Sequence, residues 1–181
     1  KLSIPLLINR PENTDLQFLP EGGHLVAGVT SKIGFKAIGE DGKGVAVTGK
    51  ILNSKQEEVA NFKSLHKGMG SFDLMPQAGE TYTAQLSLSD GTIKSYALPE
   101  VKVSGTVLSI NNPANGDSLE VNISAVTDAT MLYYLVGQTR GVVYFTKVIN
   151  LSKGTSKNYI PKNIFPTGIT RFPYLVKIIS L

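Results

Sequence analysis

The sequence predicts an all-β protein made of two tandem immunoglobulin-like antiparallel β-sandwich domains. Apolar and polar residues alternate with a period of two through most of the 181 residues, which is the pattern of strands with one buried face. Turn signals rich in glycine, proline, asparagine and aspartate recur about every 8–12 residues between these runs. No long run shows the period of an amphipathic helix. Together these observations favour antiparallel sheets packed face to face.

Three runs in the first hundred residues show the alternation. Their apolar positions are Ile33, Phe35 and Ala37; Val45, Val47 and Ile51; and Tyr82, Ala84, Leu86 and Leu88. GEDGKG at 39–44 lies between two of the runs, and its Asp-Gly pair predicts a hairpin because this dipeptide adopts the positive φ angles that tight turns need. PQAG at 76–79 closes another strand, and SDGT at 89–92 predicts a second Asp-Gly turn.

One segment leaves two interpretations open. Ser54 and Glu57 fit a helix capping box, and three apolar residues follow at a spacing of three, namely Val59, Phe62 and Leu65. Because this short motif is common by chance, a turn followed by a strand is favoured over a helix.

The second half continues the same pattern. Leu119, Val121, Ile123 and Ala125 alternate with polar residues, and PANGD at 113–117 supplies an Asn-Gly turn before them. MLYYLVG at 131–137 is apolar at successive positions, which predicts a strand buried on both faces. This strand should pair with VVYFTKVINL across QTRG at 138–141.

The domain boundary is expected at about residues 99–104, between the strands ending at LPE and those beginning at VSG. The first domain then spans 1–100, with 1–14 as a leading segment, and the second spans 101–181. Charge supports the division: residues 1–100 carry 10 Lys or Arg and 11 Asp or Glu, whereas residues 101–181 carry 8 and 3.

Composition excludes several function classes. The chain has no cysteine, so thiolate chemistry, disulfides and thioesters are impossible within it. The basic residues of the second half are spread singly, without the clustered cations and aromatics of a nucleic-acid groove, so no nucleic-acid partner is expected. No apolar run approaches the ~18 residues of a membrane helix, so no membrane span is expected. The start at Lys1 suggests a segment of a longer, processed protein.

No motif for catalysis or metal binding is present. His24 and His66 have no partner at metal-ligand spacing, and the sequence lacks a G-x-S-x-G elbow and a calcium loop. Glu21 and His24 are three residues apart, but the glycines between them favour a turn with a surface histidine. We therefore predict no enzyme activity and no catalytic, cofactor-binding or metal-binding residues.

The stretch FLPEGGHLVAG at 18–28 is predicted to be a bend at the entrance of a sheet. Pro20 lacks an amide donor and suits a strand end, while Gly22 and Gly23 tolerate positive φ before a strand near Leu25. HKGMGSF at 66–72 is predicted to reverse the chain and direct Met69 or Phe72 inward.

Residues 15–88 resemble the macroglobulin domains of the alpha-2-macroglobulin superfamily, in the form found in large Gram-negative envelope proteins. The resemblance rests on the PEGG entrance, the LVAG and FKA strands, the D-G-K-G turn and H-x-G-M-G-x-F, in that order. The second half is similar to the neighbouring domain through LVGQTRGVVY and IFPTGITRF, although PYLVKIISL departs from the polar stretch expected at its end.

The resemblance implies tandem macroglobulin-type β-sandwiches that act as a non-enzymatic scaffold or interaction module in the periplasm or at the outer membrane. Its implied partners are an envelope protein, such as a TonB-dependent outer-membrane receptor, or other domains of the same chain.

Two alternatives stay open. One is a carbohydrate-binding module, for which exposed coplanar tyrosines among Tyr133, Tyr134, Tyr144 and Tyr159 would be evidence and the absence of tryptophan is a counterargument. The other is an accessory fragment of an envelope hydrolase.

Overall fold

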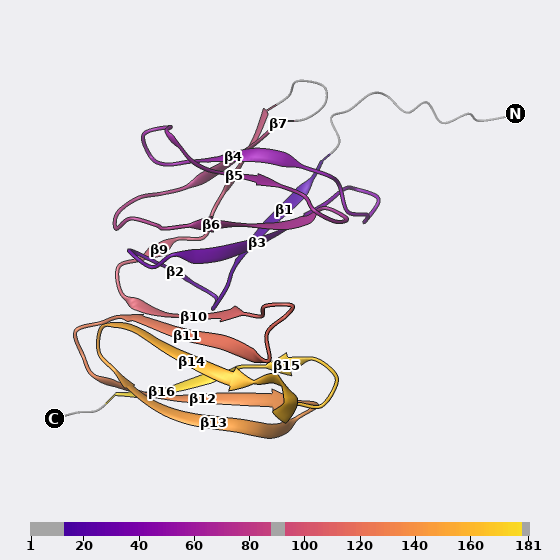
Figure 1. The fold of residues 1–181 in the computed structure, drawn as a ribbon. Coiled ribbons are helices and arrows are strands. Elements are labelled where there is room, and N and C mark those ends of the chain that lie inside the picture. Colours follow the sequence, from indigo (N-terminus) through magenta and orange to yellow (C-terminus); the bar gives the residue numbers. More distant parts are fainter. Residues whose placement is uncertain (1–12, 88–92, 179–181) are drawn as a thin grey trace, which may run out of the picture.

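The computed structural model describes residues 13–87 and 93–178, which form strands and one short 3-10 helix (Figure 1). The strands of the first half are β1 (Asp15–Pro20), β2 (Leu25–Val26), β3 (Ser31–Ile38), β4 (Thr48–Leu52), β5 (Glu58–Lys63), β6 (Met69–Leu74), β7 (Thr83–Ser87), β8 (Ile93–Ala97) and β9 (Val101–Lys102). The elements of the second half are β10 (Gly105–Asn111), β11 (Ser118–Val126), β12 (Met131–Thr139), β13 (Val142–Leu151), β14 (Gly154–Pro161), η1 (Lys162–Ile164), β15 (Thr170–Arg171) and β16 (Tyr174–Ile178).

Two antiparallel sheets enclose the core of the first half. One has the strand order β1-β3-β6 and the other β5-β4-β7-β8. The predicted alternation is confirmed in β3, where Ile33, Phe35 and Ala37 are buried, and in β7, where Ala84 and Leu86 are buried. Four phenylalanines pack against one another at the centre of this core, in mostly edge-to-face contacts: Phe18, Phe35, Phe62 and Phe72. Burial of these faces supplies the main driving force for the sandwich.

The hairpin predicted at GEDGKG is confirmed only at its turn, where Ile38 and Gly44 form an isolated antiparallel bridge. Residues 39–44 do form a turn, closed by the bond from Gly39 N–H to the Lys43 carbonyl (2.9 Å), but β3 and β4 do not pair. β1 and β6 already occupy the two edges of β3, so the chain crosses to the other sheet, where β4 pairs with β5 and β7. The second predicted Asp-Gly turn lies largely outside the described residues, although β7 and β8 on either side of it are antiparallel partners.

The turn-then-strand interpretation of residues 54–65 is confirmed. Gln56 has a positive φ of 64° in the turn, and β5 follows from Glu58. Phe62 alone of the three apolar residues enters the core, since Val59 and Leu65 are exposed at 42% and 82%. The apparent helical spacing therefore does not correspond to a buried face.

The second half is also a pair of sheets around one core. β11 pairs with β10 and β14, while β12 pairs with β13 on one edge and with β15 and β16 on the other. Both predicted hairpins are confirmed: β10 and β11 flank the Asn-Gly turn, and β12 and β13 flank Arg140 and Gly141, whose φ angles are 52° and 81°. The fold is thus an all-β arrangement of antiparallel sandwiches, as the sequence predicts.

The prediction that residues 131–137 are buried on both faces is wrong. Tyr133 and Leu135 are fully buried, but Tyr134 between them is 37% exposed. The reason is that only one face of this sheet packs on the second core. In Figure 1, β12 and β13 lie on the side of the second half that is remote from the first half.

The PEGG segment shapes the joint between the two halves. As predicted, β1 ends at Pro20, and Gly22 and Gly23 have φ angles of 80° and 89°. Glu21 then reaches the second half, where its Oε1 accepts a hydrogen bond from the Ile110 N–H of β10 (2.8 Å). A Cβ added to Gly22 would lie 2.8 Å from the Leu108 nitrogen, so only glycine fits this approach.

A short parallel ladder completes the joint. β2 pairs with β9 through Leu25 and Val101, and the Ala27 N–H donates to the Lys102 carbonyl (2.9 Å). β10 contacts both β2 and β3. With the partly buried members included, the two hydrophobic cores draw on residues 16–101 and 108–174 respectively. The domain boundary placed at residue 100 stays a prediction.

Candidate functional site

The two histidines lie apart from any cluster of ligating groups. His24 is exposed directly before β2, and His66 is exposed in the turn before β6. The Glu21 carboxylate accepts the hydrogen bond from the Ile110 N–H at the joint, so it is not paired with His24 as a metal ligand. Within residues 13–87 and 93–178, no three His, Cys, Asp or Glu side chains come together in a way that could hold a metal ion.

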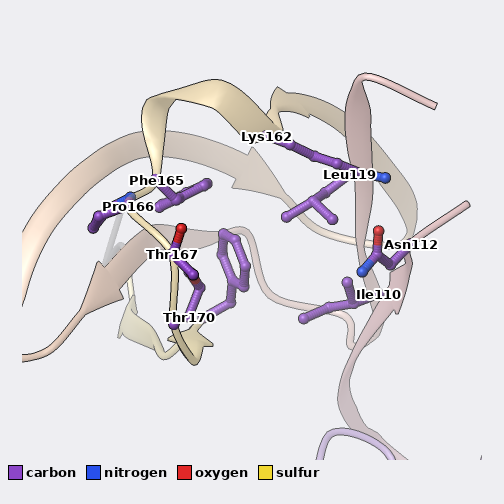
Figure 2. Close-up of a pocket in the computed structure, with 10 residues that line it drawn as sticks. Ile110, Asn112, Leu119, Lys162, Phe165, Pro166, Thr167 and Thr170 are labelled. Atoms are coloured by element: carbon purple, nitrogen blue, oxygen red, sulfur yellow. The ribbon is translucent and has the colours of Figure 1, made fainter. Parts of the chain in front are cut away.

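A pocket of about 360 Å³ opens at one end of the second sandwich, and we call it the end pocket (Figure 2). Figure 2 shows Ile110 and Leu119, from β10 and β11, on one side, facing Phe165 and Thr167 from the segment after η1. The complete lining is Ile110, Asn112, Leu119, Lys162, Phe165, Pro166, Thr167, Gly168, Thr170 and Phe172. Its volume falls at the lower end of the range for small-molecule sites.

Hydrogen bonds tie the walls of the end pocket together. Lys162 Nζ donates to the Pro113 carbonyl (2.5 Å), and the Lys162 N–H donates to the Asp117 carbonyl (2.8 Å). Both acceptors belong to the PANGD turn, so η1 is fastened to the β10–β11 hairpin. On the other side, the hydroxyls of Thr139 and Thr170 are 2.8 Å apart. The pocket is therefore built on anchored elements.

Aromatic packing forms the floor of the end pocket. Phe165 and Phe172 meet edge to face with ring centroids 5.5 Å apart, and Tyr144 contacts Phe165 at 6.3 Å. Gly137 on β12 makes room for the pair, because an added Cβ would lie 2.9 Å from the Phe165 ring. Both phenylalanines belong to the segment IFPTGITRF, which contributes only to the family resemblance and predicted no pocket.

The end pocket presents both apolar and polar side chains. Its walls are apolar and aromatic, with an amide from Asn112 and hydroxyls from Thr167 and Thr170. Lys162 is its one ionisable lining residue, and its ammonium group is already bonded to a carbonyl. Such a lining can hold an apolar or hydroxyl-bearing group.

Groups with shifted pKa values do not gather at the end pocket. A hydrogen bond from the Lys43 N–H lowers the pKa of Asp41, and one from the Ser54 hydroxyl lowers the pKa of Glu80; both lie on turns of the first half. Burial raises the pKa of Tyr96 and of Tyr174. The two carboxyl groups thus lie on turns, and the two tyrosines pack against the hydrophobic cores.

The tyrosines give mixed evidence on carbohydrate binding. Tyr133 is fully buried, and its hydroxyl is 2.9 Å from that of Thr106. Tyr134, Tyr144 and Tyr159 are exposed at 37%, 43% and 68%, but Tyr159 belongs to the sheet opposite the other two. The four tyrosines therefore do not form one platform.

The described residues form an all-β protein of paired antiparallel sandwiches, with a pocket of mixed apolar and polar lining at one end of the second sandwich. No protein-family model matches the chain, and no curated protein matches it. Among solved structures, it is similar to the native conformation of E. coli alpha-2-macroglobulin, determined by cryo-EM, with 10% identity and a TM-score of 0.35. That match covers 91% of this chain and 14% of the E. coli protein. The description of the fold rests on the strand pairing above.

Proposed function

We propose that the chain is a non-enzymatic scaffold and interaction module of a larger bacterial cell-envelope protein, periplasmic or at the outer membrane, where it works beside a TonB-dependent receptor. The resemblance of residues 15–88 to macroglobulin domains supports the envelope setting. Among the described residues, no helix is long and apolar enough to cross a membrane.

The observation that carries the scaffold role is the joint between the halves. A parallel β2–β9 pair, the Glu21 to Ile110 hydrogen bond and the close approach of Gly22 to Leu108 join the sandwiches at several points. A flexible linker would leave the halves to move independently, whereas these contacts hold binding surfaces on the two halves at a set spacing.

The experiment places a photo-cross-linking amino acid at an exposed residue of the parent protein in its native bacterium. Cross-links to an outer-membrane receptor, recovered from the envelope fraction, are the expected result. Tyr159 and Leu65 are suitable positions because both are well exposed and they lie on different halves. Recovery of the protein in the cytosolic fraction, or turnover of a substrate by the purified chain, would overturn the proposal.

The end pocket supports carbohydrate binding as a second candidate function, because its aromatic floor and its amide and hydroxyl groups suit a sugar. A glycan array probed with the purified chain tests this. Binding that is lost in Phe165→Ala but kept in Tyr159→Ala would favour the sugar, since only Phe165 lines the pocket.

A further inference from the structure

The sheet formed by β13, β12, β15 and β16 leaves an apolar face open. Tyr133 and Leu135 point into the core, so their neighbours in sequence point outward. Tyr134 has Val148 on β13 and Leu175 on β16 as its cross-strand partners, and these two are 57% and 65% exposed. We call the apolar members of the outward set the β12 face; they are Leu132, Tyr134, Val136, Val148 and Leu175, and Thr146 and Asn150 on β13 share the same side of the sheet.

Positive charges stand at both ends of the β12 face. At one end, Lys177 is the cross-strand partner of Leu132. At the other end, Arg171 is the partner of Gln138, and a cleft of about 440 Å³ is lined by Gln138, Arg140, Gly141, Ile169 and Arg171. Six residues of strand separate the two ends, which corresponds to about 20 Å.

Two arginines line this cleft. Arg140 Nη2 donates to the Thr167 carbonyl (3.1 Å), which fixes the orientation of its guanidinium group, and Arg171 lines the same cleft. Two guanidinium groups at one site favour a carboxylate, which they can bind in a bidentate manner.

The surrounding sequence supplies no acidic counter-charge of its own. The last acidic residue is Asp128, and from Ala129 to Leu181 the chain contains seven Lys or Arg and no Asp or Glu. An apolar surface with cations at both ends is complementary to a partner that carries apolar side chains between acidic ones.

The β12 face is a better docking surface than the open edge of its sheet. On the edge strand β13, Lys147 is the partner of buried Leu135 and so stands on the core-facing row, and a bulge interrupts the ladder at Gly137. Inward-directed lysines and bulges are devices that prevent strand addition at an edge. The face carries neither obstacle.

The spacing of the cations favours a protein partner. Nucleic acid carries a phosphate every few ångströms and needs cations along its whole track, but the centre of the β12 face is apolar. Membrane recruitment by charge requires a cluster of several Lys or Arg at one place, whereas here they are divided between two ends.

We propose that the β12 face docks an acidic protein segment whose carboxylates lie roughly 20 Å apart with apolar side chains between them. One carboxylate enters the Arg140 and Arg171 cleft, the other pairs with Lys177, and the apolar residues cover Tyr134 and its partners. This inference rests on the proposed function as an interaction module and names the chemistry of its partner.

The test is selection of a random 12-residue peptide library displayed on phage against the whole chain. The face variant is Arg171→Glu with Lys177→Glu, and the matched control is Lys36→Glu with Lys153→Glu, which changes the net charge equally at exposed sites elsewhere. Leu175→Asn tests the apolar centre. Circular dichroism and thermal unfolding establish that each variant is folded.

Enrichment of acidic peptides with apolar centres is the expected result, with synthetic copies losing at least about tenfold in affinity for the face variant and for Leu175→Asn. The control should bind as the original does. If the enriched peptides bind the face variant as tightly as the original chain, this inference is wrong, although an interaction module elsewhere on the chain would still be supported. No enrichment at all, or binding instead to vesicles containing phosphatidylglycerol or to a single-stranded oligonucleotide, would also overturn it.

Discussion

The Gly22→Ala substitution should open the joint between the two halves, and Gly23→Ala is its matched control. Both glycines have positive φ angles, so each alanine introduces the same kind of backbone strain. They differ in their surroundings: the new methyl group at Gly22 would meet the Leu108 nitrogen at 2.8 Å and its oxygen at 2.9 Å, whereas nothing lies within 4 Å at Gly23. Because the obstructing atoms belong to backbone, they cannot rotate away.

The magnitude follows from two contributions. Forcing alanine into the left-handed region costs about 1–2 kcal/mol in either variant. In Gly22→Ala the clash also separates Glu21 from Ile110, and a hydrogen bond to a charged group contributes about 1.5–3 kcal/mol. The two variants should therefore differ by ~2 kcal/mol, which is roughly a 30-fold difference in the equilibrium for opening the joint.

Two measurements check this prediction. Denaturant unfolding gives the difference in free energy between the variants, and amide hydrogen exchange at Ile110 reports the joint directly, since its N–H is bonded to Glu21. Protection of Ile110 should fall in Gly22→Ala and persist in Gly23→Ala. Equal free energies of unfolding together with equal protection would refute the reasoning.

Three further substitutions test the cores and turns. Asn158→Asp should lower the free energy of unfolding by about 3 kcal/mol at neutral pH, because the buried Asn158 amide donates to the Val121 and Ser156 carbonyls and a carboxylate cannot donate. Burial would raise the pKa of the new carboxyl group. Denaturation curves should therefore show that stability returns as the pH falls below this raised pKa. Ser54→Ala should raise the pKa of Glu80 toward its ordinary value in an NMR titration, since the hydrogen bond from the Ser54 hydroxyl lowers that pKa. In the original chain, this hydrogen bond contributes its full stabilisation above the ordinary carboxyl pKa. The contribution is lost as the pH falls through the lowered pKa of Glu80. Phe62→Ala should lower the free energy of unfolding, measured by thermal denaturation, by about 3–5 kcal/mol, and Leu65→Ala should lower it by less than about 0.5 kcal/mol. The reason is that the Phe62 side chain is only 2% exposed, whereas Leu65 is 82% exposed. Similar decreases in the two variants would contradict the assigned core.

Local pattern in the sequence determined the strands and most of the turns. A period of two defines which side chains share a face, so the buried set of β3 and that of β11 could be predicted without knowing their partners. Glycine and proline restrict the backbone at their own positions, which is why the bend at Pro20, Gly22 and Gly23 was also predictable.

Pairings between distant segments were decided only by the tertiary structure. The sequence predicts that β3 and β4 pair as a hairpin, but pairing there is limited to the Ile38–Gly44 bridge, and β6 occupies that edge of β3 instead. Likewise, Lys162 meets Pro113 across 49 positions of sequence, and Glu21 meets Ile110 across 89. The alternation of apolar and polar residues predicts which face of a strand is buried, but it does not predict which segment packs against that face. The end pocket, the joint and the open β12 face therefore depend on how the sheets pack in the tertiary structure.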